Sequence, residues 1–74
     1  DKALSLAVLL EETGIKQEEV IAIGDGYNDL SMIKFAGLGI AMGNAQEPVK
    51  KVANYITLTN EEDGVAEAID HFIQ

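Results

Sequence analysis

Three polar side chains, Asp25, Asn28 and Asp29, occupy a short glycine-flanked turn that directly follows the apolar run of residues 20–23. A turn of this kind joins a buried strand to a helix, and open α/β sheets bind ligands at the carboxyl ends of their strands. A pair of carboxylates attracts a hard cation such as Mg²⁺, which takes oxygen ligands and keeps several waters. We therefore predict that the chemistry of the chain lies at this turn, which supplies only part of a site.

Each of these residues also has an ordinary structural interpretation. Asn28 or Asp29 could cap the helix that follows, because short polar side chains are favoured where a helix begins. Asp25 is harder to explain in this way, since a carboxylate without a partner is costly beside a buried strand. Two aspartates at one turn repel each other unless a cation lies between them. Gly24 and Gly26 lack Cβ atoms, which would let a phosphate or a metal approach the backbone.

The elements around this turn are predicted from hydrophobic periodicity and from turn residues. The dense apolar residues of 3–12 favour a largely buried helix that stops at Gly14. Further helices are expected at 28–37, 45–52 and 60–72, and strands at 20–24, 39–42 and 54–58. Short connections between alternating helices and strands predict an α/β fold. The pattern predicts a partial doubly wound (Rossmann-like) fold, with a three-stranded parallel sheet and about four helices.

Length and composition exclude several classes of function. Seventy-four residues make one small domain or a piece of a larger one, and a start without methionine is a weak sign of a piece. The net charge of −8 argues against nucleic-acid and anionic-membrane surfaces, which need clustered Lys and Arg. The chain has no cysteine, so it can form no disulfide, and a reducing compartment fits. We expect a cytoplasmic protein without a membrane partner.

The order of residues in the turn resembles a known motif. Residues 24–32 resemble the fourth motif of the haloacid dehalogenase superfamily of phosphohydrolases. The stretches at 36–45, 49–50, 53–57 and 60–66 resemble its Cof-type subfamily of sugar-phosphate phosphatases. The likeness runs from Lys2 to about Ile69, which is nearly the whole chain.

This resemblance implies a role for four residues. Asp25 would be a ligand of the Mg²⁺ cofactor, and Asn28 would contact the phosphate of the substrate. Asp29 would support the metal site, by orienting Asp25 or a bound water. Lys2 falls where the family keeps its motif III lysine, whose ammonium would offset the charge of the nucleophile and of the phosphoryl group. Catalytic roles are thus expected for Lys2, Asp25 and Asp29, substrate binding for Lys2 and Asn28, and metal binding for Asp25 and Asp29.

The resemblance also implies what the 74 residues leave out. The family's nucleophile and general acid are two aspartates of an Asp-x-Asp motif on the first strand of the core, and no Asp-x-Asp occurs here. The motif II serine or threonine and the cap domain that selects the substrate are also absent. Residues 1–74 therefore resemble the C-terminal part of the core. The full-length enzyme would cleave a small phosphorylated metabolite through an aspartyl-phosphate, and this piece alone should be inactive.

Three other interpretations stay open at this point. The phosphorylation domain of P-type ATPases has a similar Gly-Asp-Gly motif, but it prefers Ala-Pro where this chain has Leu30-Ser31. Phosphoserine phosphatases match residues 29–33 well, while residues 42–45 and 60–66 favour the Cof type. A non-catalytic module that binds a metal or a phosphate is the alternative from another class. An Asp-x-Asp strand encoded upstream of Asp1 would decide for an enzyme.

The apolar strand at 20–24 has a further consequence. In the family it pairs with the strand that bears the nucleophile, which this chain does not contain. Its backbone groups would then remain unpaired along an uncharged edge, and proteins normally cover such edges. We therefore expect the isolated chain to self-associate through this edge or to be loosely folded.

Overall fold

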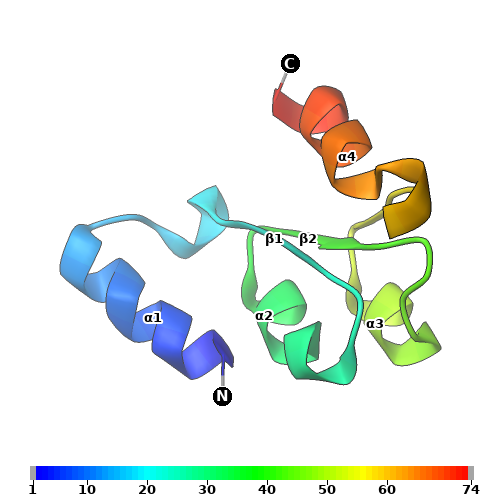
Figure 1. Ribbon diagram of the computed structural model, residues 1–74. Helices are drawn as coiled ribbons and strands as arrows, with labels where there is room; N and C mark the ends of the chain where they lie inside the picture. The colour runs from blue at the N-terminus through cyan, green and yellow to red at the C-terminus, as the bar shows by residue number, and fades with distance from the viewer. Residues whose placement is uncertain (1, 74) are drawn as a thin grey trace.

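Three parallel strands lie at the centre of the protein in a computed structural model, which describes residues 2–73 and the side chains of residues 3–72 (Figure 1). The strands are β1 (Ile21–Gly24), β2 (Leu38–Ala41) and β3 (Tyr55–Ile56), adjacent in that order. Gly24 of β1 is the register partner of Ala41, which in turn pairs with Ile56 of β3. The predicted three-stranded parallel sheet is therefore confirmed, although β3 is shorter than the expected span of 54–58.

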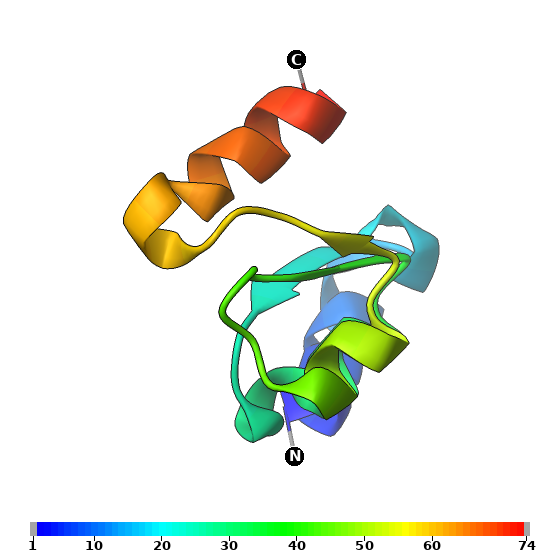
Figure 2. The ribbon, with the colours of Figure 1, turned by 90° about the vertical axis from the view of Figure 1, so that its right-hand side faces the viewer.

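Helices cover both faces of this sheet. They are α1 (Lys2–Thr13), α2 (Leu30–Phe35), α3 (Glu47–Val52) and α4 (Gly64–Ile73), with short 3₁₀ helices η1 (Gln17–Glu19), η2 (Tyr27–Asp29) and η3 (Asn60–Glu62). Two perpendicular views show α1, α2 and α3 on one side of the strands and α4 on the other (Figures 1 and 2). The α/β fold and its alternating order are as predicted. None of the helices in the described part of the chain combines the length and the apolar character that crossing a bilayer requires.

The core lies between the sheet and the pair α2 and α3. Ile33 of α2, Val49 of α3 and Ala41 of β2 have at most 1% of their surface exposed. Burial of an Ile or Val side chain of this kind contributes about 1.5–3 kcal/mol. These apolar contacts hold α2 and α3 against β2, and so fix the loops that enter both helices.

Helix α1 ends where the sequence predicts. Gly14 has a φ of 78°, in the left-handed region that glycine adopts without strain, and its N–H donates to the carbonyl of Leu10 at 2.9 Å. This is the usual way in which a glycine stops a helix.

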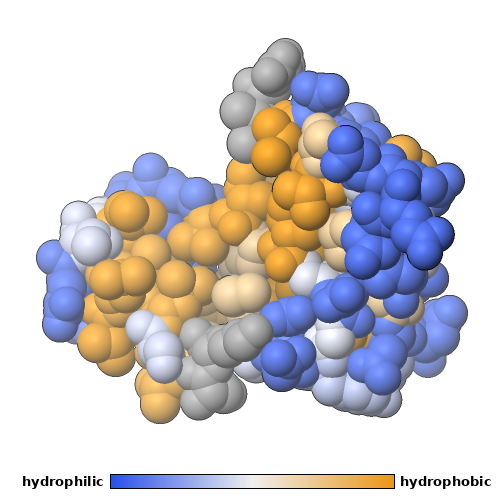
Figure 3. All heavy atoms as spheres, viewed as in Figure 1, coloured by the Kyte–Doolittle hydropathy of each residue, from blue (hydrophilic) through white to orange (hydrophobic). Residues whose placement is uncertain are grey.

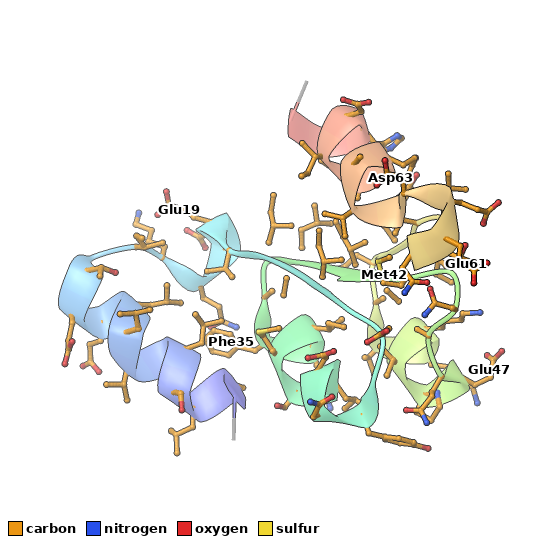
Figure 4. All side chains as sticks on the ribbon, in the orientation of Figure 1. Glu19, Phe35, Met42, Glu47, Glu61 and Asp63 are labelled. Atoms are coloured by element: carbon orange, nitrogen blue, oxygen red, sulfur yellow. The ribbon has the colours of Figure 1, made fainter. Side chains whose placement is uncertain are left out.

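The predicted burial of α1 is wrong for this chain. Leu4, Val8 and Leu9 are 66%, 51% and 53% exposed, and Figure 3 shows apolar surface over α1. The physical reason is that α1 packs mainly against one neighbour, α2, whose Phe35 points toward it (Figure 4). Among the side chains of α1 that the structure describes, only that of Leu10 is buried.

The predicted helix at 60–72 is broken in two. Asp63, labelled in Figure 4, lies between η3 and α4 with a φ of 65°, so the chain changes direction there. Helical periodicity is present on both sides of Asp63, and periodicity does not report a single left-handed residue.

A cluster of polar side chains joins α4 to β3. The Tyr55 hydroxyl donates to Glu67 Oε1 at 2.7 Å, and the hydroxyl of Thr57 contacts both Glu67 Oε2 and the carbonyl of Gly64. The hydrogen bonds from Thr57 and Tyr55, with the nearby charge of His71, lower the pKa of Glu67. The same contact raises the pKa of Tyr55, whose ring also stacks on His71 with centroids 4.8 Å apart.

An apolar hollow of about 60 Å³ lies beneath α4. Its lining consists of Ile21, Ile23, Ile40, Ala68, Ile69 and Phe72. All of these side chains are apolar, so the hollow offers a charged ligand no hydrogen-bonding partner. The hollow therefore does not suit a phosphorylated ligand.

Strand β1 forms one edge of the described sheet. It pairs with β2 on one side only, and Ile21 at its start is 43% exposed. The edge position predicted for residues 20–24 is therefore present in the structure.

Candidate functional site

The loop after β1 carries both predicted metal-binding aspartates. Asp25 follows the last residue of the strand and is exposed, whereas Asp29 lies at the end of η2 and is half-buried. Asp29 Oδ2 accepts hydrogen bonds from the backbone N–H of Asp25 at 3.2 Å and of Gly26 at 3.3 Å. Asp29 therefore fixes the stretch of backbone from which the Asp25 carboxylate projects.

Gly24 is required by the position of Asp29. A Cβ atom built on Gly24 would lie 2.6 Å from the Cβ of Asp29 and 2.7 Å from its Oδ2, closer than carbon and oxygen atoms approach. We predicted that this glycine leaves room for a phosphate or a metal. The structure corrects this interpretation, because the side chain of Asp29 occupies the space beside Gly24.

Neither polar residue of η2 caps α2 with its side chain. Asn28 lies inside η2, is exposed, and its side chain makes no hydrogen bond within the described residues. Asp29 precedes α2, yet its side chain makes no capping hydrogen bond to that helix and turns back to the loop. Asn28 therefore caps no helix, and Asp29 caps the start of η2, through the N–H of Gly26, rather than the start of α2.

A second loop, between β2 and α3, packs against the first. The backbone N–H of Gln46 donates to the carbonyl of Asp25 at 3.3 Å, and Gln46 Oε1 accepts from the N–H of Tyr27 at 3.1 Å. The side-chain amide of Asn44 donates to Asp25 Oδ2 at 3.4 Å. Sequence reasoning did not assign Asn44 or Gln46 to the site. The available signal was their place at the carboxyl end of the strand next to β1.

The side chain of Lys2, whose ammonium group is predicted to act with these residues, lies outside the described side chains. Lys2 is the first residue of α1, and the start of α1 lies at the same end of the molecule as η2 in two perpendicular views (Figures 1 and 2). Its catalytic and substrate-binding roles stay predictions.

The donor set of the first loop suits a hard cation in part. Asp25 offers an exposed carboxylate, and one oxygen of Asp29 is engaged by two backbone N–H groups. Mg²⁺ is commonly held by one or two carboxylates, completed by waters and substrate phosphate oxygens. Within the described residues, no group of three or more His, Cys, Asp or Glu side chains gathers in a way that could hold a metal. The loop thus fits Mg²⁺ as one contributor to a larger ligand set.

Other acidic side chains near this region point away from it. Figure 4 shows Glu47 on α3 and Glu61 on η3 directed outward, and both are exposed. Asp25 and Asp29, by contrast, accept hydrogen bonds from groups of the two loops at the carboxyl ends of β1 and β2.

Comparison with known proteins gives a consistent result. Residues 1–69 match the family model of the haloacid dehalogenase-like hydrolases. Among curated proteins, the chain is 58% identical over 73 residues to the 5-amino-6-(5-phospho-D-ribitylamino)uracil phosphatase YcsE of Bacillus subtilis. That match covers 99% of this chain and 29% of the relative, so the chain spans less than a third of the relative's length.

Solved structures agree with the sequence comparison. A haloacid dehalogenase-like hydrolase from Bacteroides thetaiotaomicron superimposes with a TM-score of 0.95 at 82% identity, over 96% of this chain and 27% of that one. A sugar phosphatase of subclass IIB of the same superfamily gives a TM-score of 0.92 at 44% identity, with the same coverage of 96% and 27%. In both, the similar part amounts to roughly a quarter of the larger protein.

Proposed function

Because the chain belongs to the haloacid dehalogenase-like hydrolase family, we propose that it is part of a Mg²⁺-dependent, cytoplasmic phosphatase of small phosphomonoesters such as sugar phosphates. The observation that carries this proposal is the exposed Asp25 carboxylate, held at the end of β1 on a loop that Asp29 braces through two backbone hydrogen bonds. Relatives named as phosphatases support the reaction type.

The residues of this chain hold and orient groups in the proposed reaction. Asp25 contributes a carboxylate to the cation. The carboxylate of Asp29 keeps the backbone of Asp25 in place by accepting a hydrogen bond from the Asp25 N–H group. The Asn28 amide donates a hydrogen bond to the substrate phosphate. It is available for this role because it is exposed and makes no side-chain hydrogen bond to another described residue. Lys2 supplies a positive charge for the phosphoryl group. When bound, Mg²⁺ offsets the charge of the phosphoryl oxygens.

The nucleophile of the proposed reaction is not among these 74 residues. The family uses an aspartate of an Asp-x-Asp motif, which forms an aspartyl-phosphate that water then hydrolyses. We propose that a longer protein containing this chain supplies that motif and the cap that selects the substrate.

The first test removes the Asp25 charge in the full-length protein. Asp25→Asn keeps the shape of the side chain and should lower phosphatase activity toward p-nitrophenyl phosphate by about 100-fold or more, because electrostatic stabilisation of the transferring group is lost. Circular dichroism should show an unchanged fold, since the Asp25 side chain is exposed. Glu47→Gln, an equally exposed change on α3, is the matched control and should keep the wild-type rate. Wild-type turnover by Asp25→Asn would contradict the metal assignment.

The second test uses the 74-residue chain alone. We expect no phosphatase activity and no Mg²⁺ binding of micromolar affinity by titration calorimetry, because Asp25 and Asp29 supply at most part of a ligand set. Micromolar affinity would instead favour a self-sufficient binding module, which is the non-catalytic alternative.

A further inference from the structure

Asn44 lies beside the loop that follows β1 because of the register of the sheet. Gly24 and Ala41 are register partners, so β1 and β2 end side by side, and the N–H of Met42 donates to the carbonyl of Gly24 at 2.9 Å. Asp25 begins the loop after β1, and Asn44 lies in the turn after β2. The two side chains therefore meet across the carboxyl ends of two adjacent strands.

The orientation of the Asn44 amide is determined by a third segment of the chain. Its Oδ1 accepts a hydrogen bond from the backbone N–H of Asn60 at 3.0 Å. A backbone N–H can only donate, so the oxygen of the amide must face Asn60 and the NH₂ group must face the other way. The hydrogen-bond network thus decides between the two flipped states of this amide.

The NH₂ group of Asn44 is directed at Asp25. Nδ2 lies 3.4 Å from Asp25 Oδ2, at the long end of the range for a hydrogen bond. Gln46 contacts only the backbone of the loop, at the carbonyl of Asp25 and the N–H of Tyr27. Within the described residues, Asn44 is the side chain that donates to the Asp25 carboxylate itself.

From these contacts we propose that Asn44 is a positioning residue for the Asp25 carboxylate. By engaging Oδ2, it would set the rotation of the carboxylate and leave Oδ1 as the oxygen that holds the cation. Groups that hydrogen-bond a metal-binding carboxylate in this way fix its orientation, and their loss commonly costs 10–100-fold in metal affinity or activity. This inference rests on the proposed function, since it assigns Asn44 to the same site. It also links η3 to the site through Asn60.

Variants of the full-length protein separate positioning from simple stability. Asn44→Ala removes the donor, and we expect Mg²⁺ affinity to fall about 10-fold and kcat/KM about 10- to 100-fold. Asn60→Pro removes the N–H that orients Asn44, together with the Asn60 side chain. Proline is suited to this place because Asn60 is the first residue of η3 and the preceding Thr59 has an extended ψ of 164°.

The matched control is Asn60→Ala, which keeps the N–H and loses only the side chain. We expect wild-type Mg²⁺ affinity and kcat/KM for Asn60→Ala, and losses in Asn60→Pro that are smaller than those of Asn44→Ala but in the same direction. Melting temperatures of all variants report the fold separately. If Asn44→Ala does not fold, the Asn60 pair decides the question alone.

The outcomes distinguish this inference from the proposed function. Folded Asn44→Ala with wild-type Mg²⁺ affinity and kcat/KM would overturn the positioning role, as would equal behaviour of Asn60→Pro and Asn60→Ala when Asn44→Ala is unfolded. A wild-type protein without phosphatase activity, whose Mg²⁺ affinity still falls in Asn44→Ala, would refute the phosphatase and support the positioning of Asp25.

Discussion

At the scale of single residues, the candidate site contains two carboxylates in different environments. Asp29 accepts hydrogen bonds from the backbone, and Asp25 faces solvent. Asp29 Oδ2 accepts from two successive N–H groups, so it stabilises the turn whether or not a ligand is bound. Asp25 and Asn28 are exposed and are available to external groups. The structural role of Asp29 and the roles proposed for Asp25 and Asn28 thus belong to residues at most four positions apart.

The exposed Asn28 amide gives a prediction at this scale. In the full-length protein, Asn28→Ala should raise KM and lower kcat, with a loss of roughly 10- to 1,000-fold in efficiency if the amide donates to the phosphate. Asn54→Ala is the matched control, because the Asn54 amide accepts from the N–H of Gly39 at 2.8 Å, at the opposite end of β2. It should affect stability but not steady-state efficiency. An Asn28→Ala enzyme with wild-type KM and kcat would remove Asn28 from the substrate site.

The sequence indicates candidate residues for chemistry, but it does not indicate their contacts. Asp25, Asn28 and Asp29 could be chosen because residue type and strand ends are local properties. The reversal of Asp29 toward the N–H of Asp25 could not be predicted, since helix capping was an equally reasonable use of the same side chain. Asn44 and Gln46 were missed because their contacts join loops that are about 20 residues apart.

At the scale of elements, α4 is attached to β3 by a polar cluster. Glu67 accepts from Thr57 and from Tyr55, and one turn further along the helix His71 and Phe72 pack on the Tyr55 ring. These contacts hold α4 over the apolar hollow on the face of the sheet opposite α2 and α3. Hydrophobic periodicity predicted that a helix would form here, but it could not predict the break at Asp63 or the polar cluster.

The cluster predicts a pH dependence of stability in the 74-residue chain. Hydrogen bonds from Thr57, then Tyr55, lower the pKa of Glu67 from its usual value of 4.5 in the folded state. The resulting stabilisation is present above the unfolded pKa and is lost as the pH falls through the folded pKa. Urea unfolding should therefore show that Glu67→Gln is less stable than the wild type at pH 7, with a smaller difference near pH 3.

The control for this prediction lies on the same helix. Asp70→Asn removes an exposed carboxylate of α4. It should change the unfolding midpoint little at pH 7, as surface substitutions usually do. A Glu67→Gln effect of the same size at pH 7 and pH 3 would contradict the assignment of the pH dependence to Glu67.

At the scale of the whole molecule, one face of the described surface carries broad apolar areas. Figure 3 shows apolar side chains over α1 and in the column that rises from β1 to α4. Leu4, Val8 and Leu9 contribute on α1, and Ile21 and Phe72 beside the sheet. Exposed apolar surface of this extent is typical of regions that pack against further protein. The sequence predicted a buried α1 because the composition of this helix is rich in apolar residues. The other described residues do not cover these side chains.

The edge strand predicts the behaviour of the isolated chain in solution. We expect the 74-residue chain to self-associate through β1, where backbone groups lack a second strand, despite the opposing net charge of −8. Sedimentation velocity should show species larger than a monomer. Ile21→Lys should shift the population toward monomer, because a lysine on an edge strand disfavours pairing.

Leu4→Lys is the matched control, since it places the same charge on an exposed leucine away from the edge. It should leave the association unchanged. A monodisperse wild-type monomer with a sharp cooperative melt would refute the expected association. Equal effects of the two lysine variants would assign it to the apolar surface in general rather than to the strand edge.

The close approach of Gly24 to Asp29 also limits how this sequence can evolve. Any side chain at position 24 would collide first with the Cβ of Asp29, so shortening Asp29 to alanine would not make room for it. Only a simultaneous glycine at position 29 would relieve the collision, and that change would remove the carboxylate that holds the loop. A mutation at position 24 can therefore be accommodated at position 29 only by losing that carboxylate, and a lineage that keeps Asp29 must keep Gly24.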